Sequence, residues 1–259
     1  MADTQLQFRP TLFLDTNALY YMSSYLRWTQ KENLPPYQSG KTFEQVRNTL
    51  RQYMPRDIAN WLLNGVKTLA YLQQKVNDHD AAIYTSRFAK AEVIYGVLEG
   101  QAHARLAREG LPYRMRQRAG VLSELVSMYL EPVDYQQVVG EWDNFLNLLE
   151  DKGDIVVLYV EDKEDFSRIA EVAEFLQSRI FMDVIDSWMY ACALVMQAEK
   201  IITFDGYFKR VINRLHNPQG EPDWQQLQGD LQTMLAARFL GEPTLPEVRS
   251  LPQALPDPW

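Results

Sequence analysis

Short apolar runs alternate with longer amphipathic segments along most of the chain. Four runs have the length and composition of buried strands, at residues 11–14, 81–85, 154–160 and 201–204. Most of the segments between them place apolar residues three to four positions apart, as helices do. Strand, helix and strand in this order, with short links, predict parallel strands joined by right-handed crossovers. We therefore expect a three-layer α/β/α fold with a central, mostly parallel sheet.

The pattern also predicts how the chain is divided. The alternation of strands and helices extends over about 1–215, and two long helical insertions interrupt it at about 30–80 and 100–150. Beyond residue 216 prolines recur, and only 224–239 keeps a helical pattern. We expect 1–215 to be one domain and 216–259 to be a proline-rich C-terminal appendage.

Four acidic residues lie at the edges of the predicted elements. Asp15 follows the first strand and Asp205 follows the last, while Glu92 and Asp186 lie near the starts of helices. Positions just beyond the carboxyl ends of parallel strands are where open α/β sheets bind their ligands. Gathered carboxylates repel one another, so such a cluster is costly unless a cation neutralises it. Because oxygen ligands without His or Cys favour Mg²⁺ or Mn²⁺, these four acids predict a site for one of these ions.

Three further polar residues lie close to these acids in the sequence. Asp183 precedes Asp186 by three positions and is either an additional metal ligand or, as we favour, the N-cap of that helix. Asn17 and Thr203 are expected to orient carboxylates by hydrogen bonds rather than to bind the ion. Each of the acids also has a purely structural interpretation, as a turn, cap or solvent-facing residue.

The charge balance limits the classes of partner. A net charge of −8 argues against a protein that coats nucleic acid, because such proteins are usually basic. A local basic segment beside an acidic site can still bind a polyanion. One such segment lies between residues 101 and 120, although a solvated helix face explains it equally well. The substrate-binding candidates in it are Arg105, Arg108, Arg114, Arg116 and Arg118.

Aromatic residues are concentrated just after the first acid. Helical spacing there favours packing in the core, with stacking on exposed bases as the alternative. The residues concerned are Tyr20, Tyr21, Tyr25 and Trp28.

The remaining chemistry-bearing residues have ordinary interpretations. The single cysteine, Cys192, is expected to be a buried packing thiol and suits a reducing compartment. His79, His103 and His216 lack zinc-site spacing and are expected in loops or at the surface. The N-terminus lacks a signal-peptide pattern, and no run approaches the roughly 18 apolar residues of a membrane span. We therefore expect a soluble, cytoplasmic protein with no membrane association.

In their order and spacing, the acidic motifs resemble those of PIN-domain nucleases, which include toxin ribonucleases of the VapC type. Phe13-Leu14-Asp15-Thr16-Asn17 is similar to the first motif of that family. Thr85-Ser86 followed by Glu92 is similar to the second. Asp186 leading into an alanine-containing helix matches the third, and Thr203-Phe204-Asp205 matches the fourth.

The resemblance implies a PIN-like fold and metal-dependent hydrolysis of phosphodiester bonds in nucleic acid. Asp15 and Asp186 would be direct ligands of Mg²⁺ or Mn²⁺. Glu92 would bind directly or through water, and Asp205 would bind a second ion or act through water. The resemblance also favours an endoribonuclease acting on single-stranded or looped RNA.

The resemblance leaves the partners and the activity itself open. As in toxin–antitoxin pairs, an inhibitory or complex-forming protein or a second copy of the chain could bind. A DNA-nicking or structure-specific nuclease is an alternative. So are an interaction module whose activity is absent or gated by a partner, and an α/β protein in which the acids are unrelated.

Overall fold

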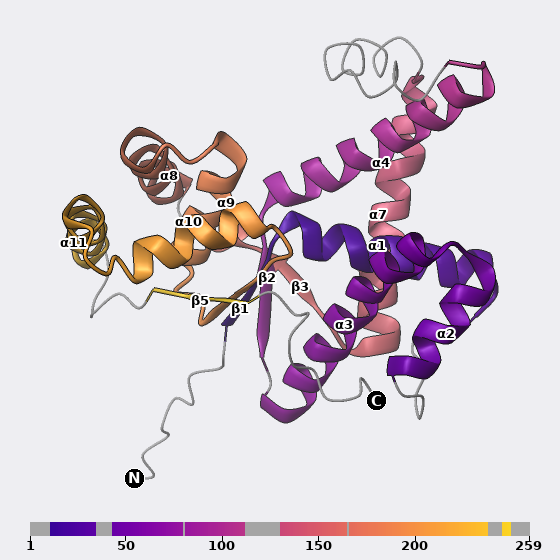
Figure 1. Ribbon diagram of the computed structural model, residues 1–259, viewed down its shortest axis with the longest axis horizontal. Helices are drawn as coiled ribbons and strands as arrows, with labels where there is room; N and C mark the ends of the chain where they lie inside the picture. Colours follow the sequence, from indigo (N-terminus) through magenta and orange to yellow (C-terminus); the bar gives the residue numbers. More distant parts are fainter. Residues whose placement is uncertain are drawn as a thin grey trace.

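Parallel strands form a single central sheet (Figure 1). The computed structural model describes residues 11–34, 43–79, 81–111, 130–164, 166–237 and 245–249. Within these residues the strand order is β3-β2-β1-β4-β5, and every neighbouring pair is parallel. The strands are β1 (Thr11–Leu14), β2 (Ala82–Thr85), β3 (Val157–Tyr159), β4 (Lys200–Ile202) and β5 (Glu247–Arg249).

Strand β1 lies at the centre of the sheet and is almost completely buried. Leu12, Phe13 and Leu14 are at most 1% exposed. A central parallel strand is covered by helices on both faces, which is why it is a continuous apolar run rather than an alternating one. In the register of the sheet, Phe13 lies between Tyr84 of β2 and Ile201 of β4.

Helices lie on both sides of the sheet, so the expected three-layer α/β/α architecture is confirmed. To the right of the strands in Figure 1 are α1 (Thr16–Lys31), α2 (Phe43–Tyr53), α3 (Arg56–His79), α4 (Arg87–Arg108) and α7 (Pro132–Gly153). To the left are α8 (Phe166–Ile180), α9 (Val184–Val195), α10 (Gly206–His216) and α11 (Pro222–Ala236). A short 3₁₀ helix, η1 (Val160–Asp162), follows β3.

The helices of the predicted insertions are packed into the domain. Helix α3 lies against α1, α2 lies against α3, and α7 contacts both α1 and α4. Together with α1 and α4 they form the layer on one face of the sheet.

The connections reverse direction between β1 and β4. The chain leaves β1 toward β2 and leaves β4 toward β5, in opposite directions from two adjacent strands. In open α/β sheets such a reversal forms a crevice outside the carboxyl ends of the strands, where ligands bind. The backbone N–H of Asp15 donates to the carbonyl of Ile202 at 3.1 Å, which fixes the two strand ends side by side.

The C-terminal region is more than the appendage that we expected for 216–259. Strand β5 pairs with β4, with Lys200 opposite Glu247 and Ile202 opposite Arg249, and its Val248 is only 7% exposed. A three-residue strand is too short to produce a recognisable alternation, and the nearby prolines suggested a tail instead. The last part of the domain's sheet therefore comes from this region.

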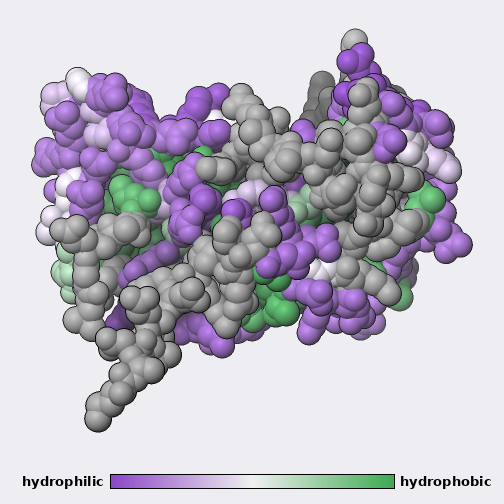
Figure 2. Space-filling model, turned by 90° about the horizontal axis from the view of Figure 1, so that it is seen from below, coloured by the Kyte–Doolittle hydropathy of each residue, from purple (hydrophilic) through white to green (hydrophobic). Residues whose placement is uncertain are grey.

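The helices are amphipathic elements of the packed domain. In α10, for example, Phe208, Ile212 and Leu215 are buried at helical spacing. Among the described residues, the surface seen from below in Figure 2 is mostly hydrophilic, with smaller hydrophobic areas. Among the described helices, none is long and apolar enough to cross a membrane.

Candidate metal centre

Asp15 is the most deeply buried of the candidate ligands, with 2% of its surface exposed. As the N-cap of α1, its Oδ1 accepts a hydrogen bond from the Thr16 backbone N–H at 2.7 Å. Its Oδ2 accepts from the Thr203 hydroxyl at 2.5 Å. The pKa of Asp15 is raised to about 6, chiefly by burial and to a smaller extent by the charges of Glu92 and Asp205, although both hydrogen bonds lower it.

Glu92 reaches the same edge of the sheet from α4. Its Oε2 accepts a hydrogen bond from the Thr16 hydroxyl at 2.5 Å, and that hydroxyl also lies 3.2 Å from the sulfur of Met189 in α9. Thr16 thus joins α1, α4 and α9. Thr16 was not among the residues expected to support the site, although its position directly after Asp15 was the available signal.

Asp186 lies in the first turn of α9. Burial raises its pKa to about 8, and Asp183, Asp15 and Asp205 contribute in the same direction. Asp183 is the N-cap of α9, since its Oδ1 accepts from the backbone N–H groups of Ile185 and Asp186, both at 2.9 Å. The favoured interpretation of Asp183 as a cap is confirmed, and its role as a metal ligand stays a prediction.

Asp205 completes the set from the end of β4. It is the N-cap of α10, and its Oδ1 accepts from the backbone N–H groups of Tyr207 at 2.6 Å and Phe208 at 3.0 Å. Its own N–H donates to the Thr203 hydroxyl at 3.0 Å, and the same hydroxyl donates to Asp15. Thr203 therefore connects two of the four acids.

Asn17 was also expected to orient the carboxylates, but none of the described contacts gives it that role. Its side chain forms no hydrogen bond with Asp15, Glu92, Asp186 or Asp205 within the part of the chain that the structure describes.

The acids repel one another, and the contacts described for them include no neutralising base. Asp15 interacts electrostatically with Glu92 and Asp205, and Asp186 interacts with Asp15 and Asp205. Among the described residues, no Lys or Arg forms an ion pair with any of the four. The set therefore carries a charge for which a bound cation would compensate.

The carboxylates do not form a closed ligand set as they stand. Within the described residues, no three acidic, His or Cys side chains lie in an arrangement ready to hold a metal ion. Asp15, Asp183 and Asp205 each use an oxygen to cap a helix, and Glu92 is held by Thr16. The chemistry of the donors nevertheless fits Mg²⁺ or Mn²⁺, because all are carboxylates and two have raised pKa values.

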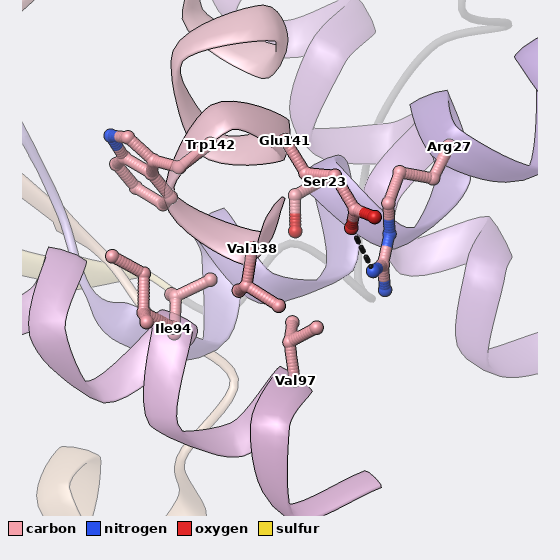
Figure 3. A pocket seen from close by; sticks show the side chains of 8 residues that line it. Ser23, Arg27, Ile94, Val97, Val138, Glu141 and Trp142 are labelled. Atoms are coloured by element: carbon pink, nitrogen blue, oxygen red, sulfur yellow. Dashed lines mark hydrogen bonds and ion pairs between the residues drawn. The ribbon is translucent and has the colours of Figure 1, made fainter. Parts of the chain in front are cut away.

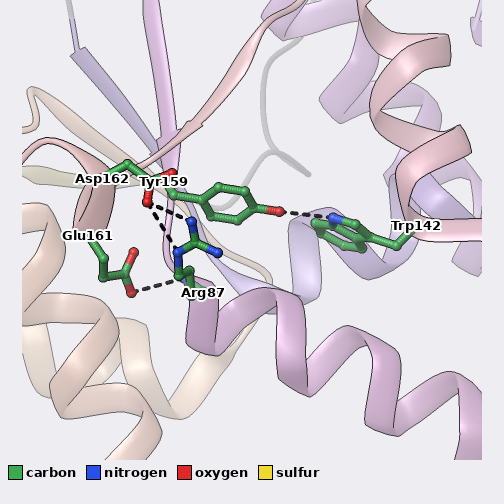
Figure 4. Close-up of polar contacts among 5 residues, drawn as sticks. All are labelled: Arg87, Trp142, Tyr159, Glu161 and Asp162. Carbon is green, nitrogen blue, oxygen red and sulfur yellow. Dashed lines mark hydrogen bonds and ion pairs between the residues drawn. The ribbon is translucent and has the colours of Figure 1, made fainter. Parts of the chain in front are cut away.

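A further acid, Glu161, lies at the carboxyl end of β3 and was not predicted (Figure 4). Its Oε1 accepts from the Arg87 backbone N–H at 2.9 Å and from Trp188 Nε1 at 3.4 Å. Its Oε2 is buried without a hydrogen-bond partner. The acid-rich sequence after the third strand was the only signal for it.

The start of α4 is tied to β3 and α7 by a group of polar contacts around Arg87 (Figure 4). The Arg87 guanidinium donates to Asp162 at 2.6 Å and lies 5.0 Å from the centre of the Tyr159 ring. Tyr159 in turn accepts a hydrogen bond from Trp142 Nε1 of α7 at 2.9 Å. These contacts fix the first turn of the helix that carries Glu92.

The described part of the basic segment lies away from the acids. Arg105 forms an ion pair with Asp134 of α7, and Arg108 is exposed near the end of α4. At 1.5 Å per residue, Arg105 lies about 20 Å along α4 from Glu92. Arg114, Arg116 and Arg118 fall outside the described residues.

No family model, curated protein or solved structure matches this chain. The resemblance to PIN-domain nucleases therefore rests on the four acidic motifs and their order in the sequence.

Proposed function

We propose that this protein is a Mg²⁺- or Mn²⁺-dependent nuclease of the PIN type that hydrolyses phosphodiester bonds in RNA. The main support is the arrangement of Asp15, Glu92, Asp186 and Asp205. They come from four different elements to one edge of the sheet, at the reversal of strand order, and no described Lys or Arg forms an ion pair with them. The choice of RNA over DNA rests on the family resemblance alone. The proposal includes a cytoplasmic location.

In this proposal Asp15 and Asp186 bind the ion directly, Glu92 binds directly or through water, and Asp205 supports a second ion or a bound water. When bound, such an ion activates a water molecule and stabilises the charge that develops on the leaving oxygen. The hydroxyl of Thr203 holds Oδ2 of Asp15, and the hydroxyl of Thr16 holds Oε2 of Glu92. These two contacts orient the carboxylates.

The raised pKa of Asp186, about 8, makes ion binding at this residue depend on pH. In the metal-free protein at neutral pH its carboxyl group holds a proton, which it must release to act as a ligand. Ion binding and activity should therefore strengthen as the pH rises toward 8.

The test is cleavage of labelled single-stranded RNA and DNA of the same sequence, with Mn²⁺, with Mg²⁺ and with chelator. We expect RNA to be cut with either ion and not with chelator, and Asp186→Asn to lose at least a hundredfold in rate. Asp230→Asn, an acid of α11 paired with Arg179, is the matched control and should keep its rate. Cleavage in chelator, or equal rates in the two variants, would count against the proposal. Preferential cutting of the DNA strand would show that the substrate is DNA and not RNA.

A further inference from the structure

Four aromatic rings form a continuous row beside the acids. The row contains Phe204, Tyr21, Trp61 and Tyr20, and we call it the aromatic strip. Phe204 and Tyr21 have ring centroids 5.1 Å apart, Tyr21 and Trp61 5.6 Å, and Trp61 and Tyr20 5.5 Å. All four side chains are partly exposed, and Tyr20, Trp61 and Phe204 also pack against the core.

The aromatic strip begins at the acidic edge. Phe204 directly precedes Asp205 in the sequence. Burial raises the pKa of Tyr21, and Asp205 contributes in the same direction, so the Tyr21 ring lies within electrostatic reach of that carboxylate. A strand whose phosphate is bound at the acids could therefore place a neighbouring base against these rings.

Through Trp61 the aromatic strip borders an open surface cavity of about 680 Å³ between α1 and α3. This volume lies within the usual range for ligand sites, roughly 300–1,000 Å³. Trp61 belongs to the aromatic strip and also lines the cavity. Trp28 and Ile58 line the cavity beside it. Arg27 and Lys31 also line it, so aromatic surface and positive charge occur together there.

The charge at the larger cavity comes from α1 and α7; Figure 3 shows Arg27 and Glu141, one residue from each helix, where they border a smaller neighbouring pocket. Arg27 of α1 pairs with Glu141 of α7 at 2.8 Å, and this pair also borders a second cavity of about 20 Å³. The second cavity has room for about one water molecule, so it is not a ligand site. With Arg27 neutralised by Glu141, the exposed Lys31 in the last turn of α1 supplies net positive charge at the larger cavity.

A second aromatic group lies near the acids, but its surroundings are negatively charged, whereas the cavity beside the aromatic strip is positively charged. Phe88 and Phe166 are 37% and 58% exposed and flank Trp188, at centroid distances of 4.6 and 4.9 Å. Glu161 and Asp162 lie next to this group, and Arg87, which pairs with Asp162, is the only base among these described contacts. Together they carry a net negative charge that would repel a phosphate backbone. For this reason the aromatic strip, and not this group, suits nucleic acid.

We propose that the aromatic strip binds the unpaired bases of a single-stranded nucleic acid, which runs from the acidic edge to the cavity beside Lys31. Every base has an aromatic face, so stacking on such rings is tolerant of sequence and excludes paired bases. This inference rests on the proposed function for its choice of ligand. It adds that α3, part of the 30–80 insertion, supplies base-binding surface through Trp61.

The test measures binding of a labelled ten-nucleotide single strand in the presence of chelator, so that no cleavage is needed. A second strand of equal length carries abasic spacers in place of its bases. We expect the abasic strand to bind the natural protein at least tenfold more weakly. Trp61→Leu should weaken binding of the base-bearing strand about tenfold and leave the abasic strand unaffected, whereas Trp61→Phe should keep most of the affinity.

Trp224→Leu is the matched control, because Trp224 is a partly buried ring on α11 that lies 4.5 Å from the Arg214 guanidinium. It should bind both strands as the natural protein does, and thermal unfolding should show that all the variants are folded. Equal affinity of Trp61→Leu and the natural protein for the base-bearing strand, or equal losses on both strands, would overturn the inference. If Trp61→Leu weakens binding in chelator but the natural protein cuts nothing in the metal-dependent assay, only the proposed nuclease is contradicted. If the protein cuts with metal but Trp61→Leu binds normally, only the role of the aromatic strip is contradicted.

Discussion

A Cβ atom on Gly65 of α3 would lie 2.3 Å from the carbonyl oxygen of Tyr21 in α1. No real side chain fits at that distance, so the glycine permits the two helices to approach closely. This approach places Trp61, one turn earlier in α3, against Tyr20 and Tyr21. The position of the aromatic strip therefore depends on a residue that has no side chain.

Gly65→Ala should destabilise the protein. The added methyl group forces α3 away from α1, and overpacking of this kind costs about 1–3 kcal/mol. The better helix propensity of Ala offsets up to about 1 kcal/mol of this. We expect a net loss of about 1–2 kcal/mol in the free energy of unfolding, measured by urea denaturation.

Gly100→Ala is the control for that substitution. Gly100 lies in α4, and a Cβ there would meet no atom within 4 Å. The same change should stabilise the protein by about 0.5–1 kcal/mol, because only the propensity effect remains. If Gly65→Ala and Gly100→Ala had the same free energy of unfolding, the close contact between Gly65 and Tyr21 would not control how α3 packs against α1.

The metal-free protein should lose stability as the pH rises from 6.5 to 8. The pKa of Asp186 is raised from 3.8 to about 8 in the folded state, chiefly by burial. Between these values the folded state holds a proton that the unfolded state has released, so raising the pH favours unfolding. Thermal midpoints measured in chelator should fall across this window, and they should fall less in Asp186→Asn. An identical slope in the variant would show that Asp186 does not hold this proton.

Acid should destabilise the protein through His216. We expected this histidine at the surface, but it is partly buried, and its Nε2 lies 2.6 Å from the hydroxyl of Tyr190. Burial lowers its pKa from 6.5 to about 4, so between these values the unfolded state binds the additional proton. The contribution of His216 to stability should fall as the pH is lowered from 6.5 to 4, opposite in sign to the contributions of Asp15 and Asp186. His216→Gln should therefore gain more stability from acid than the natural protein does in thermal unfolding. A variant with the natural protein's full pH dependence would contradict the assignment.

Thr203→Val should affect both stability and ion binding. The substitution removes the hydroxyl that donates to the buried Oδ2 of Asp15, and it leaves that carboxylate without this partner. The expected loss of stability is about 1–3 kcal/mol. Because hydrogen bonds to a ligand orient it, Mn²⁺ affinity should also fall by about tenfold or more.

The control for Thr203→Val is the same substitution at Thr233, whose hydroxyl donates to a carbonyl on the exposed side of α11. It should change Mn²⁺ affinity by less than twofold. If Thr203→Val bound Mn²⁺ as tightly as this control, Thr203 would not support the site.

The fold and the places of the four acids could be predicted because they depend on local patterns. A buried parallel strand is a continuous apolar run, and the residue that follows it lies at the carboxyl edge. Asp15 directly after Leu14 was located in this way, and Asp205 lies three residues beyond β4, which ends at Ile202 rather than at the predicted residue 204. The cap of α9 at Asp183 was likewise a local feature, since a cap bonds to the first turn of its own helix.

Contacts between distant helices could not be predicted. The hydroxyl of Thr16 meets Glu92 across 76 positions of sequence, and that pairing depends on how α1 and α4 pack. Gly65 appeared only as an isolated glycine in a helical pattern, which by itself indicates a cost rather than a close approach. The three residues of β5 were too few to show a period.

The aromatic residues of α1 show the same division. Core packing was the favoured interpretation, and it is confirmed for Tyr25, which is fully buried. Tyr20, Tyr21 and Trp28 are only partly buried. Helical spacing assigns residues to faces, but it does not tell which face an inserted helix such as α3 will cover.

The account depends most on the four acids binding a divalent cation, which Mn²⁺ titration followed by electron paramagnetic resonance measures without any choice of substrate. We predict that the natural protein and Asp230→Asn bind Mn²⁺ with the same affinity, and that Asp186→Asn binds it at least tenfold more weakly. Equal binding by all three proteins, or none by the natural one, would contradict the metal site and the nuclease proposed from it.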